Sequence, residues 1–207
     1  MSIISRLCGI QWITGEHKFQ ETFEGYHPKT ESQAQALEAV RGWADHPEGS
    51  LYFWGPAGVG KTQLARAACR QLSHDAKSWN SKGFYVDWIE FLAWARRRVG
   101  DEGYELERQL SYLKGFDPDA WDPWEEGPKV LVWDDFGQGR VTDFAVDMVT
   151  EVVHARYDRG LPTLFTSNCD VERIAQLYDD RIASRLVGMT GRGTQILKVE
   201  GPDARTG

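Results

Sequence analysis

Cysteine is scarce and scattered in this sequence. Three cysteines occur among 207 residues, at Cys8, Cys69 and Cys169. No two of them form a Cys-x-x-Cys pair, and an odd number at wide spacing predicts neither a zinc site nor a disulfide framework. We therefore interpret these thiols as buried or idle side chains.

Long apolar runs and an excess of positive charge are also missing. No apolar run approaches the roughly 18 residues that span a bilayer, and residues 1–8 lack the apolar region and cleavage site of a secretory signal. We therefore expect a cytoplasmic protein without a membrane partner. Its 24 Lys and Arg against 31 Asp and Glu give a net charge of −7. This balance argues against a strongly basic nucleic-acid-binding protein, although it leaves room for a local basic strip.

The sequence has the composition of one α/β domain, with 41% hydrophobic and 27% charged residues. Runs typical of strands alternate with runs typical of helices. Such alternation predicts right-handed crossovers, a parallel sheet flanked by helices and a ligand site at the carboxyl ends of the strands. The predicted strands are 51–54, 84–88, 129–133, 161–166 and 194–199, and the main helices are 33–44, 63–72, 90–99, 144–158, 171–178 and 181–187.

A phosphate-binding loop is the most informative motif. Residues 55–62 read Gly-Pro-Ala-Gly-Val-Gly-Lys-Thr and stand between the first predicted strand and a helix. Glycines let successive N–H groups point at phosphate oxygens, and the helix N-terminus adds partial positive charge. Lys61 would reach the β- and γ-phosphates, and Thr62 would offer its hydroxyl to Mg²⁺. The alternative is an ordinary glycine-rich turn. The predicted nucleotide-binding residues are Gly55, Pro56, Ala57, Gly58, Val59, Gly60, Lys61, Thr62 and Gln63.

Two carboxylates end a later apolar strand, and they match the second nucleotide motif, Walker B. Asp134 is expected to hold Mg²⁺ together with Thr62, because this cation selects carboxylate oxygen. Asp135 is expected to polarise the attacking water. Either carboxylate could instead cap the loop at 136–139. Because aspartate is one methylene shorter than the glutamate common at the second position, we expect slow ATP hydrolysis.

Polar residues after the next strand complete the candidate catalytic set. Asn168 follows the strand at 164–166 and could contact the γ-phosphate or the water, although Ser-Asn is also ordinary turn chemistry. Arg181 and Arg185 share one helix face. They would suit the γ-phosphate of a neighbouring subunit, or else a surface network with nearby aspartates.

These motifs, in the order Gly-Pro-Ala-Gly-Val-Gly-Lys-Thr, Trp-Asp-Asp-Phe-Gly, Thr-Ser-Asn and Arg-Ile-Ala-Ser-Arg-Leu, resemble the DnaC/IstB-like group of AAA+ ATPases over about residues 22–205. The resemblance implies a P-loop AAA+ core with a five-stranded parallel sheet, Asn168 as sensor 1 and Arg185 as an arginine finger. It also implies ATP-dependent rings or spirals, single-stranded DNA binding, and work with a replicative helicase or a transposase. We expect no C-terminal helical lid, so that a neighbouring subunit must complete the site.

Several further expectations follow. We divide the chain into an irregular N-terminal arm, residues 1–25, and an ATP-binding domain, residues 26–207, with an exposed connection at 100–128. The function expected is slow ATP hydrolysis in helicase loading during DNA replication. The alternatives are a transposition helper ATPase and a non-hydrolysing adaptor.

DNA contact is predicted for the basic cluster at 96–98. Trp88, Phe91 and Trp94 could stack on bases beside it, or form part of the core. Tyr26 could border the adenine, or pack in the ordinary way.

Overall fold

One six-stranded sheet forms the centre of the protein. The computed structural model describes residues 10–13, 19–75, 83–98, 103–117, 129–191 and 195–203. The strand order is β1-β3-β4-β5-β2-β6. Strands β2 to β6 run parallel, which confirms the predicted five-stranded parallel sheet, and β1 pairs antiparallel with β3. The strands are β1 (Ile10–Ile13), β2 (Leu51–Trp54), β3 (Gly83–Asp87), β4 (Val130–Phe136), β5 (Thr163–Ser167) and β6 (Ile196–Lys198).

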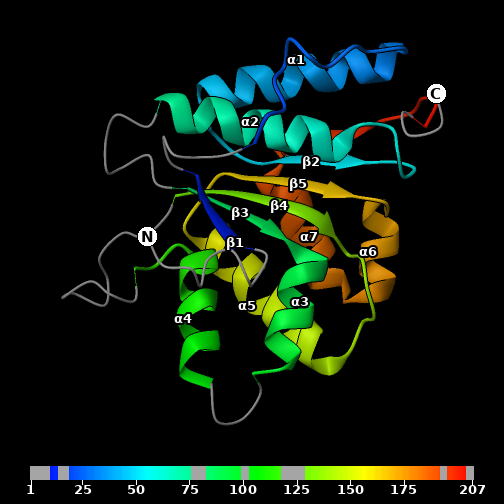
Figure 1. Cartoon of the computed structure of the whole chain (residues 1–207). Helices are drawn as coiled ribbons and strands as arrows, with labels where there is room; N and C mark the ends of the chain where they lie inside the picture. The colour runs from blue at the N-terminus through cyan, green and yellow to red at the C-terminus, as the bar shows by residue number, and fades with distance from the viewer. Residues whose placement is uncertain are drawn as a thin grey trace.

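Helices cover both faces of the sheet, with α1 and α2 on one face and α3 to α7 on the other (Figure 1). Several helices begin at a residue whose side chain accepts a hydrogen bond from the first turn, such as Thr30 before α1, Asp87 before α3 and Thr142 before α5. The helices are α1 (Glu31–Asp45), α2 (Lys61–Asp75), α3 (Trp88–Arg96), α4 (Gly103–Lys114), α5 (Asp143–Asp158), α6 (Val171–Leu177) and α7 (Asp180–Met189). None of these helices has the length and apolar character of a bilayer span.

Two elements differ from expectation. Strand β1 lies within the arm expected to be irregular, where Ile10 pairs with Val86 and Ile13 pairs with Gly83. Helix α4 lies within 100–128, so the interpretation of that whole stretch as an exposed connection is wrong. Its apolar residues Leu106, Leu110 and Leu113 are buried in the core. Residues 100–102 and 118–128 of the same stretch lie outside the described residues.

The carboxyl ends of the central strands meet at one edge of the sheet. Trp54, the last residue of β2, is in register with Ser167, the last residue of β5, and Phe136 at the end of β4 pairs with Ser167 from the other side. The loops that leave these three strands therefore start side by side. This arrangement brings together segments that are more than a hundred residues apart in the sequence.

Candidate nucleotide-binding site

The loop at 55–60 depends on glycine at three positions, because neighbouring parts of the chain leave no room for a side chain. Gly55, Gly58 and Gly60 all have positive φ, at 154°, 83° and 97°. An added Cβ would lie 2.0 Å from the Val199 carbonyl oxygen, 2.0 Å from an Asp203 carboxylate oxygen and 2.6 Å from the Tyr26 ring, respectively. The loop is thus enclosed by the chain after β6 and by the segment before α1.

Lys61 directly follows this loop as the first residue of α2, and it is 5% exposed. Its Nζ donates to the carbonyl oxygens of Gly55 at 2.8 Å and Pro56 at 2.7 Å, and to Asn168 Oδ1 at 2.9 Å. The structure therefore brings Asn168, from the end of β5, directly to Lys61. The cation and the amide face the loop whose N–H groups are expected to bind phosphate.

Asp134 is 2% exposed, and hydrogen bonds fix both of its carboxylate oxygens. Oδ1 accepts from the hydroxyl of Thr62 at 3.2 Å and from the hydroxyl of Thr166. Oδ2 accepts from the Tyr85 hydroxyl at 2.7 Å. Thr62 and Asp134 thus place two hard oxygen donors side by side, as Mg²⁺ requires. These residues fit Mg·ATP, in which the metal would neutralise phosphate charge.

Asp135 has an unusual backbone conformation, with φ of 56°. A non-glycine residue in this region is uncommon and often lies at a functional site. Its N–H donates to the Thr166 hydroxyl at 3.1 Å, and its carbonyl accepts from the N–H of Gln138 at 3.0 Å. Burial, followed by the negative charges of Asp134 and Asp87, raises the pKa of Asp135 to about 6. The second of these bonds closes a turn at the end of β4, and the Asp135 side chain remains partly exposed.

Tyr85 and Arg66 lie beside the site, and neither was expected there from the sequence. Burial and the charge of Asp134 raise the pKa of Tyr85, so its hydroxyl remains protonated and donates to Asp134. Arg66 on α2 pairs with Glu21 at 3.1 Å. No motif marks either residue: Tyr85 reaches Asp134 because β3 pairs with β4, and Arg66 lies on α2.

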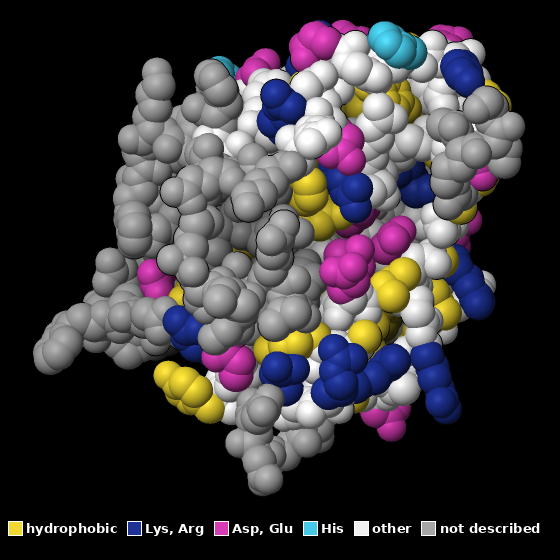
Figure 2. All heavy atoms as spheres, viewed as in Figure 1, with side chains coloured by type: hydrophobic (Ala, Val, Ile, Leu, Met, Phe, Trp, Pro, Cys, Tyr) yellow, Lys and Arg dark blue, Asp and Glu magenta, His cyan; other side chains and the backbone are white. Residues whose placement is uncertain are grey.

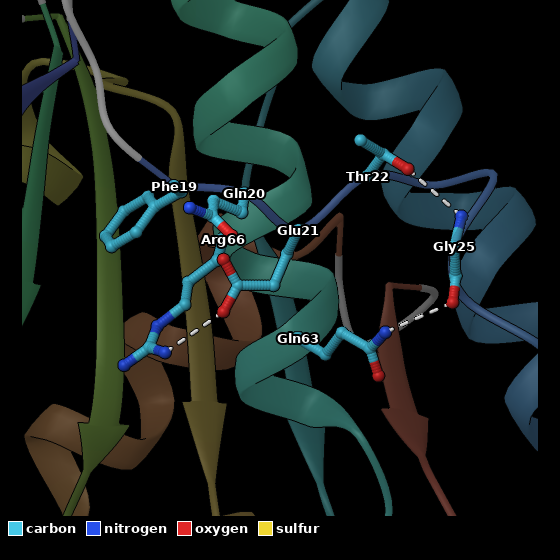
Figure 3. A pocket seen from close by; sticks show the side chains of 7 residues that line it. All are labelled: Phe19, Gln20, Glu21, Thr22, Gly25, Gln63 and Arg66. Atoms are coloured by element: carbon cyan, nitrogen blue, oxygen red, sulfur yellow. Dashed lines mark hydrogen bonds and ion pairs between the residues drawn. The ribbon is translucent and has the colours of Figure 1, made fainter.

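Beside α2, the N-terminal segment forms an open groove of about 570 Å³ (Figure 3). Gln63 extends toward this segment, and its Nε2 lies 3.4 Å from the Gly25 carbonyl oxygen. The groove is lined by Phe19, Gln20, Glu21, Thr22, Gly25, Gln63 and Arg66.

Tyr26 packs against the phosphate loop. It is 6% exposed, its ring lies against Gly60 and its hydroxyl donates to the Val59 carbonyl at 3.3 Å. These contacts assign it a part in supporting the loop. Its expected place beside the adenine stays a prediction.

The two candidate finger arginines lie on α7, which packs against α5 and α6. Arg181 is exposed, and Arg185 is partly exposed, with its guanidinium 5.8 Å from the centre of the Tyr157 ring. Arg185 Nη1 also donates to the Arg181 carbonyl at 3.4 Å. Asp179 caps the helix by accepting from the N–H of Ile182 at 3.0 Å. The role of both arginines at a second subunit stays a prediction.

The aromatic residues beside the basic cluster belong to the core. Trp88, Phe91 and Trp94 are at most 1% exposed, so the idea that they stack on bases is wrong in this structure. Arg96 and Arg97 are exposed, and Arg96 donates to the Arg140 carbonyl at 2.9 Å. Figure 2, in the same view as Figure 1, shows Lys and Arg side chains gathered across the lower part of the visible face.

Comparison with known proteins agrees with this geometry. A family model described as RNA helicase matches residues 51–157. The replicative helicase loader DnaC of Escherichia coli is 24% identical over 168 residues, covering 80% of this chain and 62% of its own length. A protein described as ATP-binding, in an insertion sequence of Mycobacterium tuberculosis, is 28% identical over 200 residues, covering 90% of this chain and 68% of its own length.

Solved structures share the fold. A DnaC helicase loader superposes with a TM-score of 0.66 at 22% identity, covering 88% of this chain and 98% of the solved chain. DnaI gives 0.67 at 21% identity, covering 90% and 92%. The initiator DnaA bound to AMPPCP and single-stranded DNA gives 0.67 at 16% identity, covering 91% and 52%.

The family model covers half of the chain, and the relatives and solved structures match over most of it. The chain spans about 62% of the length of the DnaC relatives that it matches. It is similar to DnaC helicase loaders and to an ATP-binding protein of an insertion sequence, and it has the P-loop fold of the DnaC and DnaI structures. By the family model, the chain belongs to the family described as RNA helicase.

Proposed function

We propose that this protein is an ATP-dependent assembly factor that loads a replicative helicase onto single-stranded DNA. Mg·ATP, bound by residues 55–63 and Asp134, would stabilise a multimer in which neighbouring subunits share each site. Slow hydrolysis, with Asp135 orienting the water and Asn168 contacting the γ-phosphate, would then loosen the assembly. Similarity to DnaC supports this proposal.

One observation carries the nucleotide part of the proposal, namely the 2.9 Å contact between Lys61 and Asn168. A lysine that reaches the γ-phosphate and an amide that senses it must lie at the same point. The chain brings them together from β5 and the start of α2. The adjacent pair of Thr62 and Asp134 supplies the oxygen donors for Mg²⁺.

Calorimetry with ATP and Mg²⁺ tests this part. The wild type is expected to bind, and Lys61→Ala is expected to lose most of its affinity, because the ammonium is removed from the phosphates. Arg173→Ala is a suitable control, since Arg173 is exposed on α6 and its guanidinium bonds to Gln176. Absence of wild-type binding at millimolar ATP would contradict the proposed function.

The shared site depends on Arg185. An arginine supplied across an interface contributes on the order of a thousand-fold to turnover. Arg185→Ala should therefore bind ATP normally and lose nearly all phosphate release. Native mass spectrometry, with and without ATP and single-stranded DNA, should detect the multimer of the wild type.

Mixing two inactive variants identifies the subunit that supplies the arginine. Asp135→Asn keeps Arg185 but lacks its own carboxylate, whereas Arg185→Ala keeps the carboxylate but lacks the finger. If the finger acts across an interface, the mixture recovers part of the turnover. A mixture as inactive as its components, or normal turnover by Arg185→Ala alone, would contradict the assignment.

DNA contact is proposed for Arg96 and Arg97, which are exposed next to the β4–α5 loop. Each contact to a single-stranded phosphate contributes about 0.7 to the slope of log affinity against log salt. Arg96→Ala and Arg97→Ala should each reduce this slope by about that amount in fluorescence anisotropy. Competing DNA and RNA oligonucleotides would identify the preferred strand.

Two alternatives differ in what the assembly does. The similarity to a protein of an insertion sequence favours a transposition helper, and a pull-down against a replicative helicase and a transposase, each with ATP, separates the two roles. A non-hydrolysing adaptor would retain one nucleotide per chain without phosphate release.

A further inference from the structure

Tyr85 holds the side of the Asp134 carboxylate that faces away from Thr62. The two hydroxyls of Thr62 and Thr166 bond to Oδ1, whereas the phenol of Tyr85 bonds to Oδ2 at 2.7 Å. The carboxylate cannot rotate about its bond to Cβ without breaking bonds on both oxygens. Together with the two threonines, Tyr85 therefore fixes the orientation of the carboxylate plane.

The Tyr85 side chain is itself held by neighbours from the N-terminal segment and from α2. The Phe19 ring contacts the Tyr85 ring edge-on, with centroids 4.8 Å apart. The Arg66 guanidinium lies 5.4 Å from the centre of the Phe19 ring and pairs with Glu21 at 3.1 Å. Burial alone would lower the pKa of Arg66, but Tyr85 and Glu21 raise it.

The N-terminal segment is thereby tied to the candidate metal site. Arg70 on α2 also donates to the Gln20 carbonyl at 2.9 Å, so two arginines of one helix hold residues 20 and 21. Figure 3 shows Arg66 and Glu21 facing one another between the segment and α2. The outer end of this set of contacts lines the groove described above.

We propose that Tyr85 is a positioning residue for the magnesium-binding carboxylate of Asp134, and that residues 19–21 hold Tyr85 in place through Phe19 and Arg66. The inference rests on the proposed function. Its physical reason is that Mg²⁺ accepts little deviation from octahedral geometry. Partners that orient a ligating carboxylate therefore affect metal affinity without touching the metal.

Tyr85→Phe tests the role because it removes the hydroxyl and keeps the ring that contacts Phe19. The measurement is Mn²⁺ affinity by electron paramagnetic resonance in the presence of ADP, together with ADP affinity in EDTA. We expect about ten-fold weaker Mn²⁺ binding and unchanged metal-free ADP affinity. Tyr112→Phe makes the same chemical change at a buried tyrosine on the opposite face of the sheet, and it should leave both affinities unchanged.

The outcomes separate the two levels of the proposal. A Tyr85→Phe protein with wild-type Mn²⁺ affinity and a lower melting temperature would show a merely structural role and overturn the inference. A wild type that binds no ADP would overturn the proposed function, and the positioning role with it.

Glu21→Gln tests the outer end of the chain of contacts. This change keeps the size of the side chain and removes the charge that holds Arg66. Mn²⁺ affinity should fall in the same direction as in Tyr85→Phe, by a smaller factor, because Glu21 acts on Asp134 only through Arg66, Phe19 and Tyr85. Wild-type affinity in Glu21→Gln would overturn the part assigned to the N-terminal segment.

Discussion

At the scale of single residues, the backbone at Asp135 is the clearest sign of a functional constraint. A left-handed conformation at a non-glycine residue costs on the order of 1–3 kcal/mol, and here it occurs inside β4, where the pairing with β5 is irregular between Trp133 and Phe136. The chain returns to the pairing with β5 at Phe136, so the irregularity is confined to the residues around Asp135. Replacing the side chain while keeping its shape therefore separates chemistry from folding.

Asp135→Asn should retain nucleotide affinity within about three-fold and lose about a hundred-fold or more in turnover, because a general base contributes roughly 10²–10⁴-fold. Phosphate release and calorimetry on the same preparation measure the two quantities. Turnover close to that of the wild type would assign the water to another group.

Glycines of the same chain should respond in opposite ways to alanine. Gly55→Ala forces a Cβ to within 2.0 Å of a backbone oxygen, so both stability and ATP affinity should fall. Gly42 lies in α1, and a Cβ added there would meet no neighbouring atom of the described residues within 4 Å outside the helix's own backbone. Gly42→Ala should therefore stabilise the protein by about 0.5–1 kcal/mol. Thermal unfolding of both variants provides the comparison, and equal effects would contradict the close approach at Gly55.

The residues that the sequence could identify are those of contiguous motifs. The glycines of the loop, Lys61 and Asp134 stand in fixed patterns whose chemistry is local. Tyr85 could not be found in this way, because its hydroxyl reaches Asp134 from the neighbouring strand and a tyrosine in an apolar strand is ordinary. The same limit applies to Asp203, whose carboxylate lies against Gly58.

At the scale of elements, Arg156 explains how the overlooked helix α4 is held in place. The residue is 1% exposed, and its guanidinium donates to Thr163 Oγ1 at 2.7 Å and to the carbonyls of Leu113, Lys129 and Pro162 at 2.9, 2.6 and 2.9 Å. Burial, and then the charge of Arg159, lowers the pKa of Arg156 to about 9. One side chain of α5 thus joins the end of α4 to the starts of β4 and β5.

Arg156→Met should reduce the free energy of unfolding by about 3 kcal/mol, because it leaves three carbonyls and a hydroxyl buried without this donor. Urea denaturation measures the change. Arg173→Met, at an exposed arginine of α6, should remain within about 0.5 kcal/mol of the wild type. A small effect at position 156 would mean that water or another donor replaces the guanidinium.

The elements themselves were predictable where one period continues over many residues. Helices α1 and α5 and the continuous apolar run of β4 are of this kind. Helix α4 carries apolar residues at helical spacing, but acidic residues with Gly, Pro and Trp around it concealed that period. Strand β1 has four residues, and so short a segment is defined by its pairing with β3 and not by its own pattern.

At the scale of the whole molecule, nucleotide binding should couple to stability. The loop is packed against the segment before α1 and the chain after β6, so ligand bound there favours the entire fold. At a hundred times its dissociation constant, Mg·ATP contributes about 2.7 kcal/mol. For a chain of this size the melting temperature should rise by about 5–10 °C.

Differential scanning calorimetry with and without Mg·ATP checks this expectation. Lys61→Ala should melt at one temperature in both conditions. A rise of the same size in Lys61→Ala would place the binding elsewhere on the protein.

The parallel sheet of β2 to β6 could be predicted, because alternating strands and helices admit few arrangements. Assembly could not be predicted, since Arg181 and Arg185 share a helix face whether they contact the phosphate of a neighbouring subunit or face solvent. The order of the motifs identifies the site residues that one subunit contributes. It does not identify the surfaces that meet those of another chain.

The outermost strands of the sheet, β1 and β6, have four and three residues. Short edge strands offer few free backbone groups to a strand of another chain, and this protects a protein against edge-to-edge aggregation. In the proposed assembly, copies of this protein would therefore meet through side chains on helices and loops. Contacts of this kind would be reversible, so the proposed assembly would be able to come apart and its subunits to be used again.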